Sequence, residues 1–231
     1  MFQGAADVGS ARRSFAGRNI SLFHVTPERA LTVISGADRN IRMFHRRPVG
    51  GRTVGAMRTV DVEALIDFTY WADRQILQAA TALPVEDFTR SITITYRDLR
   101  GTLVHTLDVE LSWRRRLRGE PKEIWDTSLS VDDYPTADVL AEHWARDEIE
   151  TRDWLASLTD EDLGAIQDLG DGDRFPLWYY LVHIVTHSEQ QRRDAQLILR
   201  HLGHEPPDLE FLYYADSLVE PGASPSGSRR G

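Results

Sequence analysis

The chain has 231 residues, of which 41% are hydrophobic, and carries a formal net charge of −9 without a single cysteine. This length allows one well-packed core flanked by tails. The lack of cysteine excludes disulfides, thiolate metal sites and cysteine nucleophiles, so any metal must bind to His, carboxylate or amide groups. No apolar run approaches 18 residues, which excludes a membrane-spanning helix, and together with the lack of cysteine this predicts a cytoplasmic location.

Residues 1–58 form a basic segment with ten arginines against three acidic residues and no sustained periodicity. We predict a poorly ordered N-terminal extension, and three interpretations stay open. The first is an extension upstream of a natural start at Met57. The second is an arginine-rich tail that contacts an acidic partner, and the third is a targeting peptide. Residues 59–216 instead carry a net charge of −17. A surface this acidic argues against nucleic-acid binding through the main domain, because phosphate contacts need a basic face.

Helical periodicity begins at Asp61, a predicted N-cap, and the first helix ends before Pro84. Residues 88–95 are predicted to form a loop with some extended character. A second helix is predicted from about Asp98 to Leu117, and Gly119 supplies its C-terminal stop.

The third predicted helix opens at residues 135–136 and runs to about Leu158. The fourth begins at Pro176 and ends at Gly203. Residues 209–214 read as a short apolar lid, and residues 217–231, rich in Ser, Pro and Gly, as a disordered tail. Four long helices without convincing strand pairing predict an all-α fold, a four-helix bundle over residues 59–216.

The fourth helix carries the pattern that most directly suggests chemistry. His183, His187 and Gln191 recur every four residues, so they fall within about 80° of one another around the helix. Apolar residues share this arc, which predicts that the three polar groups point inward. Two histidines four residues apart lie on one face of a helix with their Cβ atoms about 6 Å apart, so both imidazoles can bind one ion. His105 on the second helix is the best-placed third ligand. The alternative is that these histidines are satisfied core residues without metal.

Several stretches, in unbroken order over about residues 60–215, resemble the DinB superfamily, relatives of YfiT-type thiol S-transferases. They are residues 71–73 (WAD), 99–105 (LRGTLVH), 181–187 (LVHIVTH), Arg192, and 199–207 (LRHLGHEPP). The resemblance implies a four-helix bundle with up-down-down-up connection, assembled as a homodimer and associated with stress responses.

The resemblance also implies a divalent metal, zinc, nickel or similar, held by one histidine of the second helix and two of the fourth. These positions correspond to His105, His187 and Gln191, so glutamine stands where the family has its third histidine. An amide oxygen is a weaker ligand than imidazole for such ions. Three hypotheses stay open: Gln191 coordinates weakly, His183 supplies the missing nitrogen, or the site no longer holds metal.

For function, the resemblance implies a metal-dependent thiol S-transferase, or a related enzyme, acting on a small molecule. Because the chain has no cysteine, the thiol must be a low-molecular-weight cosubstrate. The alternative is a non-catalytic binding or dimerisation protein that lost tight metal binding through Gln191. Neither a membrane nor a nucleic acid is an expected partner.

Overall fold

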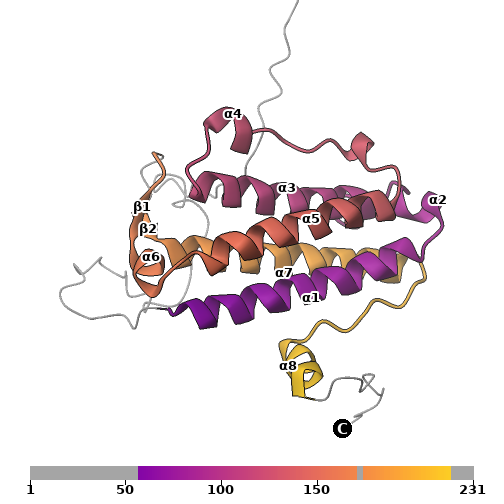
Figure 1. Cartoon of the computed structure of the whole chain (residues 1–231). Coiled ribbons are helices and arrows are strands. Elements are labelled where there is room, and N and C mark those ends of the chain that lie inside the picture. Colours follow the sequence, from indigo (N-terminus) through magenta and orange to yellow (C-terminus); the bar gives the residue numbers. More distant parts are fainter. Residues whose placement is uncertain (1–56, 171–173, 220–231) are drawn as a thin grey trace, which may run out of the picture. The chain divides into compact units, whose positions relative to one another are not determined.

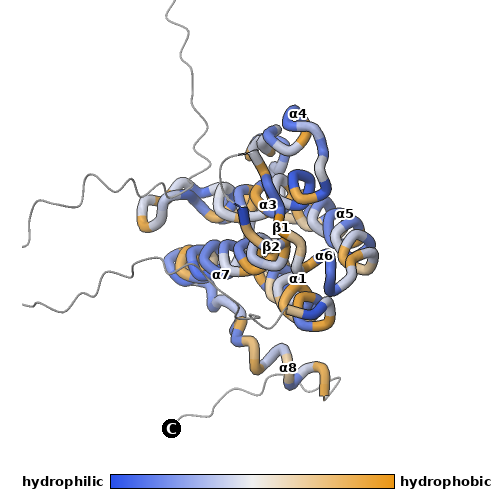
Figure 2. The backbone as a smooth tube through the Cα atoms, turned by 90° about the vertical axis from the view of Figure 1, so that its left-hand side faces the viewer, coloured by the Kyte–Doolittle hydropathy of each residue, from blue (hydrophilic) through white to orange (hydrophobic). Residues whose placement is uncertain are grey.

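Four long helices form the bundle in this computed structural model, which describes residues 57–170 and 174–219. They are α1 (Thr59–Thr81), α3 (Leu99–Leu117), α5 (Ala137–Ala156) and α7 (Leu177–His201). Helices α1 and α7 run in one direction and α3 and α5 in the other, which confirms the predicted up-down-down-up connection (Figure 1). Viewed from the side in Figure 2, the four helices form a ring in which each of α1 and α3 lies between α5 and α7.

Short elements connect or extend these helices. Two antiparallel strands, β1 (Ile166–Asp168) and β2 (Arg174–Pro176), precede α7, with Ile166 opposite Pro176. This hairpin was not predicted, because strands of three residues are too short for an alternating pattern to stand out. The remaining short elements are α2 (Val85–Phe88), α4 (Lys122–Trp125), the 3-10 helix η1 (Val131–Asp133), α6 (Asp160–Gly164) and α8 (Phe211–Val219).

The helix ends follow local capping chemistry. Helix α3 begins where it was predicted, and Asp98 is its N-cap, since Asp98 Oδ1 accepts a 2.8 Å hydrogen bond from the Gly101 N–H. Gly119 and Gly203 have φ of 75° and 86°, the left-handed conformation that ends α3 and α7. The prediction that Asp61 is the N-cap of α1 is wrong: α1 is capped by Arg58, whose N–H donates to Asp61 Oδ2 at 3.2 Å.

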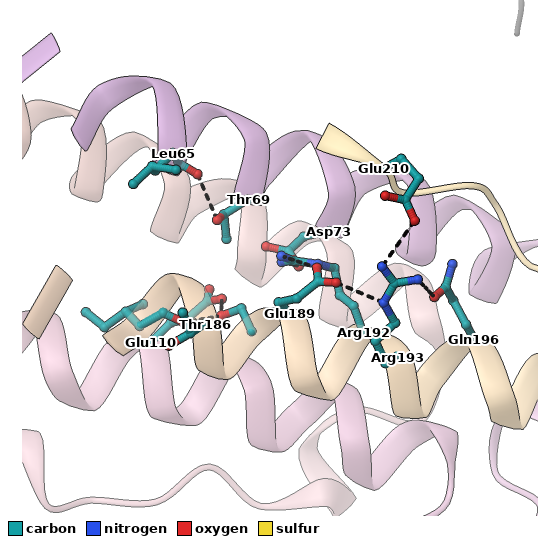
Figure 3. Close-up of polar contacts among 12 residues, drawn as sticks. Leu65, Thr69, Asp73, Glu110, Thr186, Glu189, Arg192, Arg193, Gln196 and Glu210 are labelled. Carbon is teal, nitrogen blue, oxygen red and sulfur yellow. Dashed lines mark hydrogen bonds and ion pairs between the residues drawn. The ribbon is translucent and has the colours of Figure 1, made fainter. Parts of the chain in front are cut away.

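The core combines aliphatic side chains with buried ion pairs. Leu99, Leu107, Leu140 and similar residues of all four helices are fully buried. Between α1 and α7, the guanidinium of Arg192 donates to Asp73 Oδ1 at 2.9 Å, and each side chain is only 2% exposed (Figure 3). Further members of this polar core are Glu110 and Arg114 of α3, Asp147 and Thr151 of α5, and Ser188 of α7.

The C-terminal helix α8 packs on α1 through aromatic rings. Phe68 contacts Phe211 with ring centroids 5.2 Å apart, and Trp71 contacts Tyr214 at 5.8 Å. Figure 2 shows α8 as a largely hydrophobic segment. The predicted apolar lid is therefore a helix, and it continues to Val219, past the start of the predicted disordered tail. The rest of that tail, residues 220–231, and residues 1–56 of the predicted extension lie outside the described residues.

Among the described residues, no helix is long and apolar enough to span a lipid bilayer.

Candidate functional site

His105 of α3 and His187 of α7 lie side by side where these two helices pack together. Their ring centroids are 5.3 Å apart and the ring planes meet at 73°. Both residues are half-buried. The structure thus brings together the two histidines that the sequence analysis placed at the centre of the site.

The pair lies on the flank of the bundle, not in its core. The buried face of α7 is centred near Ile184, Ser188 and Ala195, which puts His187 at its edge. On α3, His105 lies about 160° around the helix from the buried Leu103. The prediction that the polar stack points inward is therefore only partly right.

His183 departs furthest from that prediction, because it is exposed. Counting 100° per residue, it lies about 40° beyond His187 on the solvent side of α7. Its ring packs edge to face against Trp113 at 5.3 Å and lies 6.5 Å from the ring of His187. His183 is thus a neighbour of the histidine pair, supported by an aromatic contact.

Burial and nearby positive charge keep the paired imidazoles uncharged. Burial is the main cause that lowers the pKa of His105 to about 4, and the Arg97 guanidinium lowers it further. Burial also lowers the pKa of His187 to about 4, with smaller effects from His105, His183 and Arg97. Near neutral pH both rings are therefore neutral and keep a free ring-nitrogen lone pair, the form in which imidazole binds metals.

The geometry of the pair fits a shared divalent ion. Two imidazoles bound to one tetrahedral zinc place their ring centroids about 5 Å apart, close to the 5.3 Å between His105 and His187. His187 Nδ1 is also buried without a hydrogen-bond partner among the described residues, and such a group requires one.

His183 does not fit the same ion in this conformation. Even with the ion midway between two rings, the ring centroids of two zinc-bound imidazoles are at most about 6.4 Å apart. The His183 and His187 centroids are 6.5 Å apart, and a tetrahedral arrangement requires a much shorter separation. This favours Gln191 over His183 as the third group.

Gln191 is half-buried on α7, one turn beyond His187. At four residues from His187, its amide lies on nearly the same side of the helix as that histidine. Across residues 57–170 and 174–219, no three or more His, Cys, Asp or Glu side chains gather in a way that could hold a metal ion. A metal here would therefore depend on two imidazoles and this amide.

A cavity of about 450 Å³ opens beside His105. Its walls come from residues 91–92, the segment 96–98, the first turns of α3, and Leu129 and Val131. Arg97, Arg100 and Asp108 line it together with His105. The volume lies within the usual range for small-molecule sites.

Two carboxylates near His105 in sequence turn out to have different surroundings. Asp108 lines the cavity, and its Oδ1 accepts a 2.8 Å hydrogen bond from the Leu129 N–H. Glu110 is buried in the core, where Ser188 Oγ and Trp144 Nε1 both donate to it. Of these two carboxylates, only Asp108 lines the cavity with His105, which makes it the candidate general base.

Sequence reasoning missed Arg97 and Arg100 as residues of this site. Their only signal is position, since they flank Asp98, the predicted start of α3, one or two turns before His105.

Comparisons with known proteins agree with this architecture. The model of the DinB family matches residues 57–223. The crystal structure of a DinB-like protein from Bacillus cereus matches with a TM-score of 0.50 and 16% sequence identity, over 66% of this chain and 98% of that chain. At this identity the similarity shows the fold alone. No protein with a curated description matches the chain.

Proposed function

The chain belongs to the DinB family, and on that premise we propose that it is a metal-dependent enzyme that transfers a small thiol to a second small molecule. The observation that carries the proposal is the pairing of His105 and His187 at 5.3 Å, the separation expected for two imidazoles on one ion. Gln191 completes the proposed ligand set with its amide oxygen. Zinc and nickel are the ions that this nitrogen-rich set favours.

The reaction joins the thiol sulfur to an electrophilic carbon, while the leaving group departs with its electron pair and the thiol proton is lost. A divalent ion at this site would supply the positive charge that lowers the pKa of the thiol. The chain itself holds the reactants in the cavity beside His105. Asp108 on the wall of that cavity is the candidate acceptor of the thiol proton.

Metal binding is the direct test. Purified protein without a histidine tag is titrated with zinc and with nickel by calorimetry, next to His105→Ala and His187→Ala. The expected result is one equivalent of bound metal in the wild type and loss of binding in both variants. His201→Ala is the control, since His201 is exposed at the far end of α7. If the wild type bound neither zinc nor nickel, the proposal that the protein is a metalloenzyme would be overturned.

Activity is then measured as conjugation of a model electrophile to a small thiol, with and without the bound metal. Turnover that requires both the metal and the two histidines is expected. Conjugation at the uncatalysed rate, across several metals and thiols, would contradict the proposal.

The second candidate is a binding protein of the same fold without tight metal affinity. Gln191 favours it, because an amide oxygen replaces the imidazole expected at this position. The homodimer, the cytoplasmic location and the link to stress stay predictions in either case.

A further inference from the structure

Two arginines line the cavity beside His105, and the proposed transfer reaction gives neither of them a role. Arg97 and Arg100 are both half-buried and both line the cavity. Arg100 Nε is buried and has no hydrogen-bond partner among the described residues. A buried guanidinium nitrogen without a partner is costly, and a bound anion would satisfy it.

Both aspartates that line the cavity accept hydrogen bonds from backbone N–H groups. Asp98 Oδ1 accepts from the Gly101 N–H at 2.8 Å, and Asp108 Oδ1 accepts from the Leu129 N–H at 2.8 Å. Within residues 57–170 and 174–219, neither Arg97 nor Arg100 forms a salt bridge, although the charge of Asp194 acts on Arg97. Both guanidinium groups therefore remain able to bind a ligand.

The side chain of Arg97 is held between its neighbours. Its guanidinium stacks over the ring of Tyr96, 4.8 Å from the ring centroid. Its aliphatic stem lies against Gly101, where a Cβ would sit 3.4 Å from Arg97 Cβ and 3.1 Å from Asp98 Oδ1. The absence of a side chain at Gly101 thus leaves room for Arg97 at the start of α3.

Arg97 also lies near the histidine pair, since it lines the same cavity as His105, whose ring contacts the ring of His187. An anionic group held by Arg97 and Arg100 would therefore be bound within the same site as the two imidazoles. Asp98 and Asp108 line the cavity, and the charge of Asp194 acts on Arg97. These negative charges repel a doubly charged phosphate more strongly than a singly charged carboxylate, which favours the carboxylate as the ligand.

We propose that Arg97 and Arg100 bind the carboxylate of a small acidic thiol, so that the thiol cosubstrate is selected by its negative charge. The proposal rests on the thiol-transfer function above and adds to it a ligand class and two binding residues. Guanidinium groups bind carboxylates through paired hydrogen bonds, which gives both affinity and orientation.

The test compares N-acetylcysteine with its amide, two thiols that differ in the carboxylate. Calorimetry on the full chain measures the Kd of each, in zinc-loaded and in chelator-treated protein. The acid is expected to bind at least tenfold more tightly than the amide. In Arg97→Gln and Arg100→Gln this preference is expected to fall below threefold, while the affinity for the amide stays unchanged.

Two further variants control for charge and for folding. Arg90→Gln removes an exposed arginine that lies before the cavity segment and pairs with Asp87, and it should keep the full preference. Arg100→Lys keeps the positive charge but cannot form the paired hydrogen bonds of a guanidinium group. This variant should therefore keep part of the preference for the acid. Circular dichroism melts check that each variant is folded.

The outcomes separate this proposal from the function on which it rests. A preference for the acid that persists without metal supports the arginine site even if metal dependence fails. Zinc-dependent binding of both thiols with equal affinity supports the transferase and overturns the arginine site. Absence of binding of either thiol in both states of the protein also overturns the arginine site.

Discussion

His105 and His187 face one another edge to face, with ring centroids 5.3 Å apart, from two helices that run in opposite directions. Burial lowers the pKa of each ring to about 4, so both are neutral at physiological pH. Two neutral imidazoles in this arrangement supply two corners of a tetrahedral metal site. The affinity of the site for metal then depends on the third ligand, and α7 carries Gln191 at that position.

Gln191→His is expected to tighten zinc binding at least tenfold, about 1.4 kcal/mol. The substitution replaces an amide oxygen with an imidazole nitrogen, which zinc prefers. Competition with a chromophoric chelator measures the affinity. Gln190→His is the matched control, since Gln190 is the adjacent, exposed residue of the same helix. Equal zinc affinities for wild type and Gln191→His would exclude position 191 from the ligand set.

His183→Ala is expected to leave zinc affinity within about twofold of the wild type, under about 0.4 kcal/mol. The reason is distance, because the His183 and His187 rings are 6.5 Å apart and His183 packs on Trp113 instead. The same chelator competition is used, with His187→Ala as the positive control. A tenfold loss in His183→Ala would show that His183 turns toward the metal, and would restore it as the third ligand.

Local sequence signals predicted the bundle well. Asp98 and Gly119 mark the ends of α3 because caps and stops act within a few residues. The pairing of His105 with His187 was also predictable, from the resemblance to a known family. The exposure of His183 was not, because it depends on where α3 packs against α7.

Long-range polar pairing escaped prediction for a similar reason. Asp73 and Arg192 are separated by 119 positions in the sequence, and neither residue reveals its partner locally. Charged residues in an amphipathic helix are ordinarily assigned to solvent. The cavity at Arg97 and Arg100 likewise depends on how residues 91–98 and 129–131 fold over α3.

Arg192→Met is expected to lower the free energy of unfolding by about 3–5 kcal/mol, since it leaves Asp73 buried without its cation. Urea unfolding followed by circular dichroism measures the loss. The double variant Asp73→Leu with Arg192→Met should recover most of it, because two apolar side chains replace the pair.

Arg74→Met is the control for this pair. Arg74 is bound to Glu148 at 2.7 Å, but about half of its side chain is exposed. An ion pair of this kind contributes about 0–1 kcal/mol. If Arg192→Met cost no more than Arg74→Met, the Asp73–Arg192 pair would not be a stabilising element of the core.

Glu110→Gln is expected to flatten the dependence of stability on pH. Burial, reinforced by the negative charge of Asp73, raises the pKa of Glu110 to about 8, against the hydrogen bond from Ser188. Between pH 4.5 and about 8 the folded protein therefore holds a proton that the unfolded chain, with an ordinary pKa near 4.5, releases. Stability falls as pH rises through this window, because the folded state binds more protons than the unfolded state.

Glutamine keeps the shape of a protonated glutamate but does not titrate, so this contribution disappears in Glu110→Gln. Urea unfolding at several pH values should give a wild type that loses stability toward pH 8 and a variant with a shallower slope. Glu142→Gln, an exposed position on α5, should keep the slope of the wild type. Identical slopes for wild type and Glu110→Gln would mean that Glu110 is already ionised within the core. Its negative charge would then have to be balanced there by Arg192, whose charge acts to lower its pKa.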